Sequence, residues 1–228
     1  MAELVVALDL PSRAGALGVV ERLGDAVRWY KVGPVLFVAE GPAVVRDLLD
    51  RGARVFLDLK WHDIPHAVSG AVEAAAALGV SLGTVHLAGG RAMLEAAARA
   101  AAGRIRLVGV GVLTSLDRVA YGEVVGRAVE DVGAEIERLA LAGVAAGLDG
   151  VVCSPAEARR LRGALGPRAL LVVPGIRRPG ASGDDQARSA GPGEAAAAGA
   201  DLLVVGRPVT GASDPRGAAL AILAEMGR

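Results

Sequence analysis

The stretch from Val55 to Pro65 reads VFLDLKWHDIP and places charged residues in an otherwise apolar segment. Side chains alternate along a strand, so Asp58 and Lys60 should share one face with Phe56. The opposite face would be entirely apolar and would pack against helices: Val55, Leu57 and Leu59. Asp58 and Lys60 would then point into the mouth of a barrel. Buried charges cost several kcal/mol per ion unless they are paired and hydrogen-bonded, so these two residues need partners.

Short apolar runs of the same kind recur along the chain, separated by Ala-rich stretches that favour helices. There are eight of them: 4–10, 26–33, 53–60, 81–89, 105–115, 148–154, 169–176 and 200–207. Near-continuous apolar strands that alternate with helices are typical of parallel strands buried on both faces. Eight such units in 228 residues predict an α/β fold, a closed (β/α)8 TIM barrel, as a single domain over residues 1–228. An open doubly wound sheet is the alternative.

Two connections are predicted to be long loops. One runs from Ser115 to about Glu130, and the other from Gly175 to Gly191. The second is rich in Gly, Pro, Arg and Asp, a composition that suits a mobile lid over a site.

Composition excludes several classes of protein. Lys plus Arg and Asp plus Glu number 25 each, so no global charge points to nucleic acid or anionic lipid. Cys153 is the lone cysteine, which rules out an intrachain disulfide and suits a reducing cytoplasm. Neither a signal peptide nor a membrane span is recognisable, so we expect a cytoplasmic protein with no membrane partner.

Charged residues gather where the predicted strands end. Asp9 ends the first run, Lys31 the second, and Asp58 and Lys60 the third, while Asp63 follows closely. Chemistry in a barrel of this kind occurs at the C-terminal ends of the strands. A structural ion pair could explain Asp58 and Lys60 alone, but an alternating Lys–Asp–Lys–Asp array favours a functional site.

Asp63 has a second interpretation. Pro65 is suited to the first position of a helix, and Asp63 could cap that helix. Taken singly, this residue fits capping and catalysis equally well.

A phosphate site is predicted from the loops after the last two runs, where many barrels bind phosphate. Gly175 and Gly206 would let backbone N–H groups approach an anion closely. Arg207 offers a planar fork of donors that matches phosphate.

Most of the remaining motifs are interpreted as structural and not as functional. His62 and His66 are four residues apart, but Pro65 between them spoils a zinc-binding helical face. Cys153 is expected in the core, and Ser154 is expected to cap a helix that begins at Pro155. His86 ends a predicted strand and could contact a ligand or be a satisfied structural histidine.

These residues together resemble the orotidine 5′-monophosphate decarboxylase family. DLKWHDIP follows that family's Asp-x-Lys-x-x-Asp signature, in its DIP-containing form. Further matching segments follow in the family's order: ALDL, WYKVG, VHLAGG, GVLTS, GVVCSPAEA, VVPGIRRPG, DDQAR and LLVVGRPVTGASDP. The resemblance runs essentially from end to end.

The resemblance implies a role for each matching residue. The catalytic residues would be Lys31, Asp58, Lys60 and Asp63. The substrate orotidine 5′-monophosphate would be bound by Asp9 at the ribose, by Thr114 or neighbouring Ser115 at the pyrimidine, and by Ile64, Pro174, Gln186, Gly206 and Arg207. Gln186, Gly206 and Arg207 match the residues that bind the substrate phosphate in this family. Asp63 and Ile64 would reach the partner's site across a homodimer interface. Ala67 departs from the family, because many members have a threonine there that reaches the partner's ligand.

The resemblance also implies the reaction. The enzyme would release CO2 from orotidine 5′-monophosphate to make UMP in pyrimidine biosynthesis, with no metal and no cofactor. Lys60 would stabilise negative charge at C6 and donate a proton there.

Two competing functions stay open. The 3-keto-L-gulonate 6-phosphate decarboxylases and hexulose-phosphate synthases share Asp-x-Lys-x-x-Asp but bind magnesium, through an acidic residue where this chain has Lys31. A lysine there opposes a divalent cation, which prefers carboxylate oxygens. The other alternative is a non-catalytic nucleotide-binding barrel, which would not need a buried Lys60.

Overall fold

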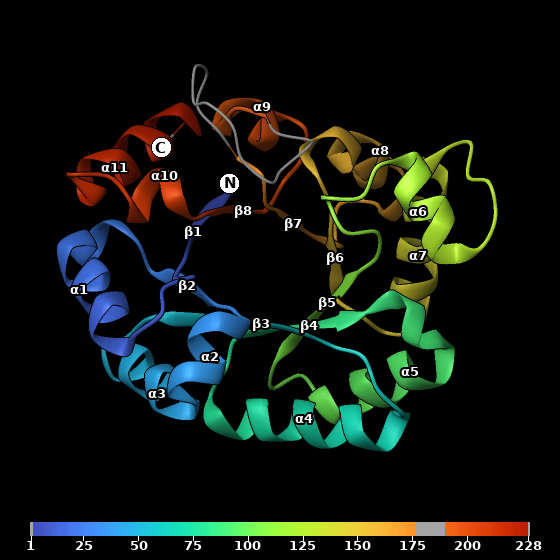
Figure 1. Ribbon diagram of the computed structural model, residues 1–228, viewed down its shortest axis with the longest axis horizontal. Helices are drawn as coiled ribbons and strands as arrows, with labels where there is room; N and C mark the ends of the chain where they lie inside the picture. Colours follow the sequence, from blue (N-terminus) through green and yellow to red (C-terminus); the bar gives the residue numbers. More distant parts are fainter. Residues whose placement is uncertain (1, 177–189, 228) are drawn as a thin grey trace.

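A computed structural model describes residues 2–176 and 190–227 of the chain. Eight parallel strands close into a barrel in sequence order, with helices around the outside (Figure 1). The strands are β1 Glu3–Ala7, β2 Trp29–Val32, β3 Arg54–Trp61, β4 Leu82–His86, β5 Arg106–Val110, β6 Gly150–Val152, β7 Leu170–Val173 and β8 Leu202–Val205. Val5 of β1 lies opposite both Trp29 of β2 and Val204 of β8, which closes the ring. The predicted barrel is confirmed, and the open sheet is wrong.

At least one helix follows each strand, and most helices begin at a proline, whose fixed φ suits the first helical position. They are α1 Arg13–Leu23, α2 Pro34–Glu40, α3 Pro42–Asp50, α4 Pro65–Leu78, α5 Gly90–Ala101, α6 Arg118–Val125, α7 Val132–Ala145, α8 Pro155–Leu165, α9 Pro192–Ala197, α10 Arg207–Thr210 and α11 Pro215–Glu225, with 3-10 turns η1 Gly24–Ala26 and η2 Leu87–Gly89. Within the described residues, no helix is both long and apolar enough to span a bilayer.

The core has two parts, divided by the barrel wall. A large apolar cluster joins the outer face of the strands to the helices, and Val55 and Leu57 belong to it. A smaller cluster fills the barrel interior: Val5, Ala7, Trp29, Phe56, Leu82, Val108, Val172, Leu202 and Val204. Leu59 also packs against the large cluster, whereas Asp58 and Lys60 lie with Phe56 at the barrel mouth, so the alternation predicted for the third strand is confirmed. This inner cluster forms the floor on which the site stands.

The strand β3 is irregular where its charges lie. Leu57 is opposite Gly83 of β4 and Trp61 is opposite Val85, with a register shift between the two pairs. The three residues from Asp58 to Lys60 therefore face the single residue Thr84. Lys60 has a φ of 51°, in the left-handed region that non-glycine residues rarely adopt.

The first predicted long loop is wrong, because residues 118–125 form the helix α6. Asp117 caps this helix by accepting hydrogen bonds from the N–H groups of Val119 and Ala120, both at 2.9 Å. Gly122 inside the helix weakens its sequence signal. The second predicted loop was the lid, and its residues 177–189 lie outside the described residues. The residues on either side of this segment, Ile176 and Ala190, form an isolated β-bridge.

Candidate active site

A pocket of about 450 Å³ opens at the C-terminal ends of the strands. Its polar lining comprises Asp9, Lys31, Asp58, Lys60, Thr114, Arg207 and Thr210. Its apolar lining comes from interior positions of the strands and the loops after them: Ala7, Phe56, Val110, Val112, Leu113, Val152, Val172, Pro174 and Val204. A concave site with an apolar floor and a few convergent polar groups is typical of a small-molecule site.

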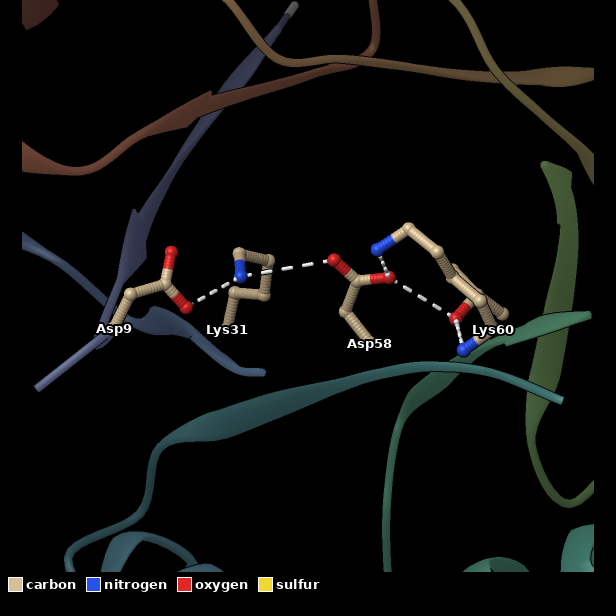
Figure 2. A network of polar contacts seen from close by, with 5 residues as sticks. Asp9, Lys31, Asp58 and Lys60 are labelled. Carbon is tan, nitrogen blue, oxygen red and sulfur yellow. Dashed lines mark hydrogen bonds and ion pairs between the residues drawn. The ribbon is translucent and has the colours of Figure 1, made fainter. Parts of the chain in front are cut away.

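Four charged side chains cross this pocket in a row, with alternating sign (Figure 2). Lys31 Nζ donates to Asp9 Oδ1 at 2.8 Å and lies 3.6 Å from Asp58 Oδ2. Lys60 Nζ donates to the other oxygen of the Asp58 carboxylate, Oδ1, at 2.9 Å. Lys31 is buried, and the Asp58 side chain is 13% exposed. Because each charge has an opposite neighbour, two cations and two anions can be held together in a partly dry pocket.

Lys31 and Lys60 are the only lysines in the chain. Arginine occupies all the other positions in the count of Lys plus Arg. Lysine carries a compact ammonium that can give up a proton, whereas arginine stays protonated in proteins. Sequence reasoning missed this signal: a chain that otherwise uses arginine has lysine only at the pocket.

Gly33 is a further residue that sequence reasoning missed. A Cβ at this position would lie 2.6 Å from Asp9 Oδ1 and 2.9 Å from Lys31 Nζ, so a side chain there would force the ends of these two side chains to shift. The absence of a Cβ lets β2 end directly beneath the two charges. The segment WYKVG contained this glycine, but only the fold shows what it approaches.

Thr84 was also missed. It lies in β4, is fully buried, and contacts both Asp58 and Lys60 through its hydroxyl group. Strand alternation could have found it, because Leu82 and Thr84 share a face and Leu82 is part of the barrel interior.

Asp63 and Ile64 do not join this pocket in their own chain. Both are exposed at the rim, and Asp63 Oδ1 accepts a hydrogen bond from the N–H of Ile64 at 2.7 Å. The residue at the N-cap of α4 is Ile64, so the alternative that Asp63 caps this helix is wrong. Asp63 and Ala67 line a separate surface hollow together with Lys60.

The residues expected at the phosphate lie on the far side of the pocket from β3. Gly206 and Arg207 follow β8, and Pro174 and Gly175 follow β7. Gly175 has a φ of 78°, a conformation that favours glycine. Gln186, the remaining residue of this group, lies outside the described residues.

His86 is near the pocket but is not part of its lining. Its Nδ1 accepts a hydrogen bond from the N–H of Ala88 at 3.2 Å, and its ring stacks on His62 with centroids 4.9 Å apart. Burial lowers the pKa of His86 below its ordinary value of 6.5, and the charges of His62 and Lys60 lower it further. The structural alternative for this histidine therefore fits better than ligand contact.

Cys153 and Ser154 are placed as the sequence predicts. Burial raises the pKa of the Cys153 thiol to about 12, which suits an inert core residue. Ser154 caps α8, and its N–H donates to the Glu157 carboxylate at 3.0 Å in a capping box. Across residues 2–176 and 190–227, no three His, Cys, Asp or Glu side chains cluster as a metal site would require.

Known proteins resemble the chain along nearly its whole length. The family model described as "Orotidine 5'-phosphate decarboxylase / HUMPS family" matches residues 2–222. A protein of Anaeromyxobacter sp. named "Orotidine 5'-phosphate decarboxylase" is 51% identical over 223 residues, covering 98% of this chain and 97% of the relative. A protein of the same name from Moorella thermoacetica is 48% identical over 234 residues, covering 98% and 92%. The crystal structure of orotidine 5′-phosphate decarboxylase from Lactobacillus acidophilus superposes with a TM-score of 0.88, at 34% identity and full coverage of both chains.

Proposed function

This chain belongs to the orotidine 5′-phosphate decarboxylase / HUMPS family, and we propose that it converts orotidine 5′-monophosphate to UMP and CO2. The names of its relatives support a carboxy-lyase. The observation that carries the proposal is the row Asp9–Lys31–Asp58–Lys60 across one pocket. The reaction belongs to pyrimidine biosynthesis. We further propose a single catalytic domain that works in the cytoplasm, as the lone cysteine suggests.

The chemistry follows from where the charge develops. Loss of CO2 from C6 of the pyrimidine leaves an electron pair with no attached electron sink, so the barrier is high. Lys60 would stabilise that developing charge and then give its proton to C6, so the electron pair left by the broken C–C bond becomes the new C–H bond and Lys60 becomes a neutral amine. Such an interaction is stronger in the transition state than in the ground state, which is the condition for catalysis.

Asp58 has two tasks in this mechanism. Its carboxylate accepts from Lys60 Nζ at 2.9 Å and so directs the ammonium into the pocket. The substrate carboxylate would lie against Asp58, and that contact between like charges disappears when CO2 leaves.

The remaining pocket residues would bind the parts of the substrate that do not react. Asp9 would accept from a ribose hydroxyl, with Lys31 hydrogen-bonding nearby. Thr114 would read the pyrimidine edge, Pro174 would contact the ligand, and Gly206 and Arg207 would hold the phosphate with Gln186. Charge-assisted bonds to phosphate are among the stronger hydrogen bonds, and their energy can hold the reacting groups in place.

Lys31 favours a mechanism without a metal ion. Its ammonium lies between the carboxylates of Asp9 and Asp58, at 2.8 Å and 3.6 Å. A divalent cation prefers carboxylate oxygens as ligands. Here the Lys31 ammonium already pairs with both carboxylates and would repel such a cation. The donor set thus opposes the magnesium-dependent sugar-phosphate reaction.

A homodimer with a shared site is the second part of the proposal. Asp63 and Ile64 are exposed at the rim, and Ile64, which is 67% exposed, places an apolar side chain in water. In a dimer related by a two-fold axis, both residues would enter the partner's pocket and both sites would form by the same operation.

A turnover assay with purified protein and excess chelator tests the function. We expect orotidine 5′-monophosphate to be consumed and UMP to form at the rate seen without chelator. The matched control is Lys60→Ala protein prepared in the same way, which excludes a contaminating enzyme. Activity that is lost on chelation and restored by magnesium would support the sugar-phosphate reaction instead.

A further inference from the structure

Thr84 carries a buried hydroxyl at the end of the charged row formed by Asp58 and Lys60. It lies on the interior face of β4, with no exposed surface, and it does not line the pocket. Its hydroxyl has two partners, the backbone N–H of Lys60 and the carboxylate of Asp58. Both partners belong to the residues to which the proposed function gives the central roles.

The bulge in β3 explains why a side chain is needed here. Asp58, Leu59 and Lys60 face the single residue Thr84, so the backbone of Lys60 has no regular partner in β4. The N–H of Lys60 donates instead to Thr84 Oγ1 at 2.8 Å. Lys60 has a left-handed backbone, with a φ of 51°, which persists only when its surroundings hold it.

The second hydrogen bond follows from the first. A threonine hydroxyl has one proton, and the bond from the Lys60 N–H uses its oxygen as the acceptor. The proton is therefore directed to Asp58 Oδ1, 3.1 Å away. That same carboxylate oxygen accepts from Lys60 Nζ at 2.9 Å, so one hydroxyl fixes the carboxylate and the backbone of the lysine that it holds.

We propose that Thr84 is a positioning residue for the decarboxylation, which acts through Asp58 and Lys60 without touching the substrate. Its hydroxyl sets the direction of the Asp58 carboxylate and holds the strained backbone that aims the Lys60 ammonium. The residue opposite Thr84 in β5 is Val108, an apolar residue of the barrel interior. This role rests on the proposed function.

The kinetic test compares Thr84→Val, Thr84→Ala and Thr84→Ser with the unmodified protein. Valine and alanine remove the hydroxyl, and a misplacement of about 1 Å in a reacting group costs roughly 100-fold in rate. We expect kcat to fall by roughly 10- to 100-fold in both, with the KM for orotidine 5′-monophosphate within about three-fold, because the binding groups stay in place. Serine keeps the hydroxyl and should restore most of kcat.

A matched control separates positioning from stability. Ser154→Ala removes another buried hydroxyl, at the N-cap of α8, and Ser154 is not part of the pocket lining. We expect this variant to lower the melting temperature and to leave kcat unchanged. If Thr84→Val and Thr84→Ala fold and keep the kcat of the unmodified protein, or if serine fails to restore it, Thr84 has no positioning role.

Amide hydrogen exchange of Lys60 gives a readout that needs no turnover. With Thr84→Val the Lys60 N–H loses its acceptor, so we expect it to exchange at least 10-fold faster, while Val108 in the neighbouring strand is unchanged. Unchanged exchange at Lys60 would overturn the proposal even if kcat falls. If the unmodified protein does not decarboxylate orotidine 5′-monophosphate, the proposed function fails, and the exchange result still decides whether Thr84 holds the Lys60 backbone.

Discussion

The two ends of the barrel both carry charged side chains, but these charges have different partners. At the N-terminal ends of the strands, Arg162 donates to the carbonyl oxygens of Gly166, Ala169 and Gly199, with shortest distances of 2.8 Å, and to Asp201 at 2.6 Å. Asp201 also accepts from the backbone of β7, and Asp149 from the backbone of β5, each at 2.8 Å. At the C-terminal ends, Lys31 and Lys60 pair with carboxylates beside an open pocket.

The difference shows how the same residue types serve two purposes. A charge that is satisfied by backbone groups stabilises the loops and strand ends that supply them. A charge that is satisfied by another charge, beside a cavity, can exchange that partner for a ligand. The first end should therefore control stability and the second activity, as in other barrels of this class.

The largest effect should come from Lys60. Lys60→Ala removes the proposed proton donor, and general acid catalysis contributes about 10²- to 10⁴-fold, so we expect kcat to fall by at least that range. Binding of UMP and the melting temperature should change little. Lys60→Arg is the sharper companion, because it keeps the charge but cannot give up the proton. Substantial kcat in either variant would show that another group protonates C6.

Subunit mixing should restore activity if the site is shared. Lys60→Ala and Asp63→Ala damage different halves of one site, so in a mixed dimer one site carries both changes and the other carries neither. Random exchange of equal amounts should recover about a quarter of the sites. Each variant mixed with itself is the control. If exchange is demonstrated and activity does not return, Asp63 acts in its own subunit or not at all.

Arg207 tests the opposite wall of the same pocket. Charge-assisted bonds to phosphate are worth about 1.5–3 kcal/mol, so Arg207→Ala should weaken UMP binding by roughly 10- to 100-fold. Uridine, which has no phosphate, should bind almost as before, and calorimetric titration of both ligands measures the contrast. An equal loss for the two ligands would place the phosphate elsewhere.

Arg162 tests the N-terminal end. Arg162→Met removes the donor to three carbonyl oxygens and the cation paired with Asp201, and we expect about 2–3 kcal/mol of lost stability with kcat intact below the melting range. The matched control is Arg160→Met, whose partners Asp131 and Glu137 are surface carboxylates, so its effect on chemical denaturation should be much smaller. If Arg162→Met lost kcat but kept its stability, the conclusion that the N-terminal end controls stability and not activity would be wrong.

The smallest effect concerns pH and stability at the mouth. Burial lowers the pKa of His86 below 6.5, so the unfolded chain takes up a proton at this residue before the folded chain does. Stability contributed by neutral His86 is present above pH 6.5 and is lost as the pH falls from 6.5 through the folded pKa. In the His86→Asn variant, the denaturation midpoint should depend less on pH within that window. His66→Asn, at an exposed histidine, is the control. An unchanged slope would show that His86 does not titrate differently on folding.

The sequence by itself determined the barrel and most of the pocket. Eight apolar runs gave the strands, because strands buried on both faces need apolar residues throughout. Charges at the ends of those runs then had to converge at one mouth, which brings Asp9, Lys31, Asp58 and Lys60 together. The resemblance of the motifs to a known family added the expected role of each residue.

Only the tertiary structure decided how those charges are held. The bulge that sets Thr84 against three residues of β3, and the left-handed backbone of Lys60, depend on the register between two strands, which no single run encodes. Gly33 matters because Asp9, 24 residues earlier in the chain, lies close to it in the folded structure. The helix α6 formed in spite of Gly122, because packing and the Asp117 cap outweigh a weak local preference. Local pattern determines which face a residue occupies, whereas contacts between distant segments determine its partners.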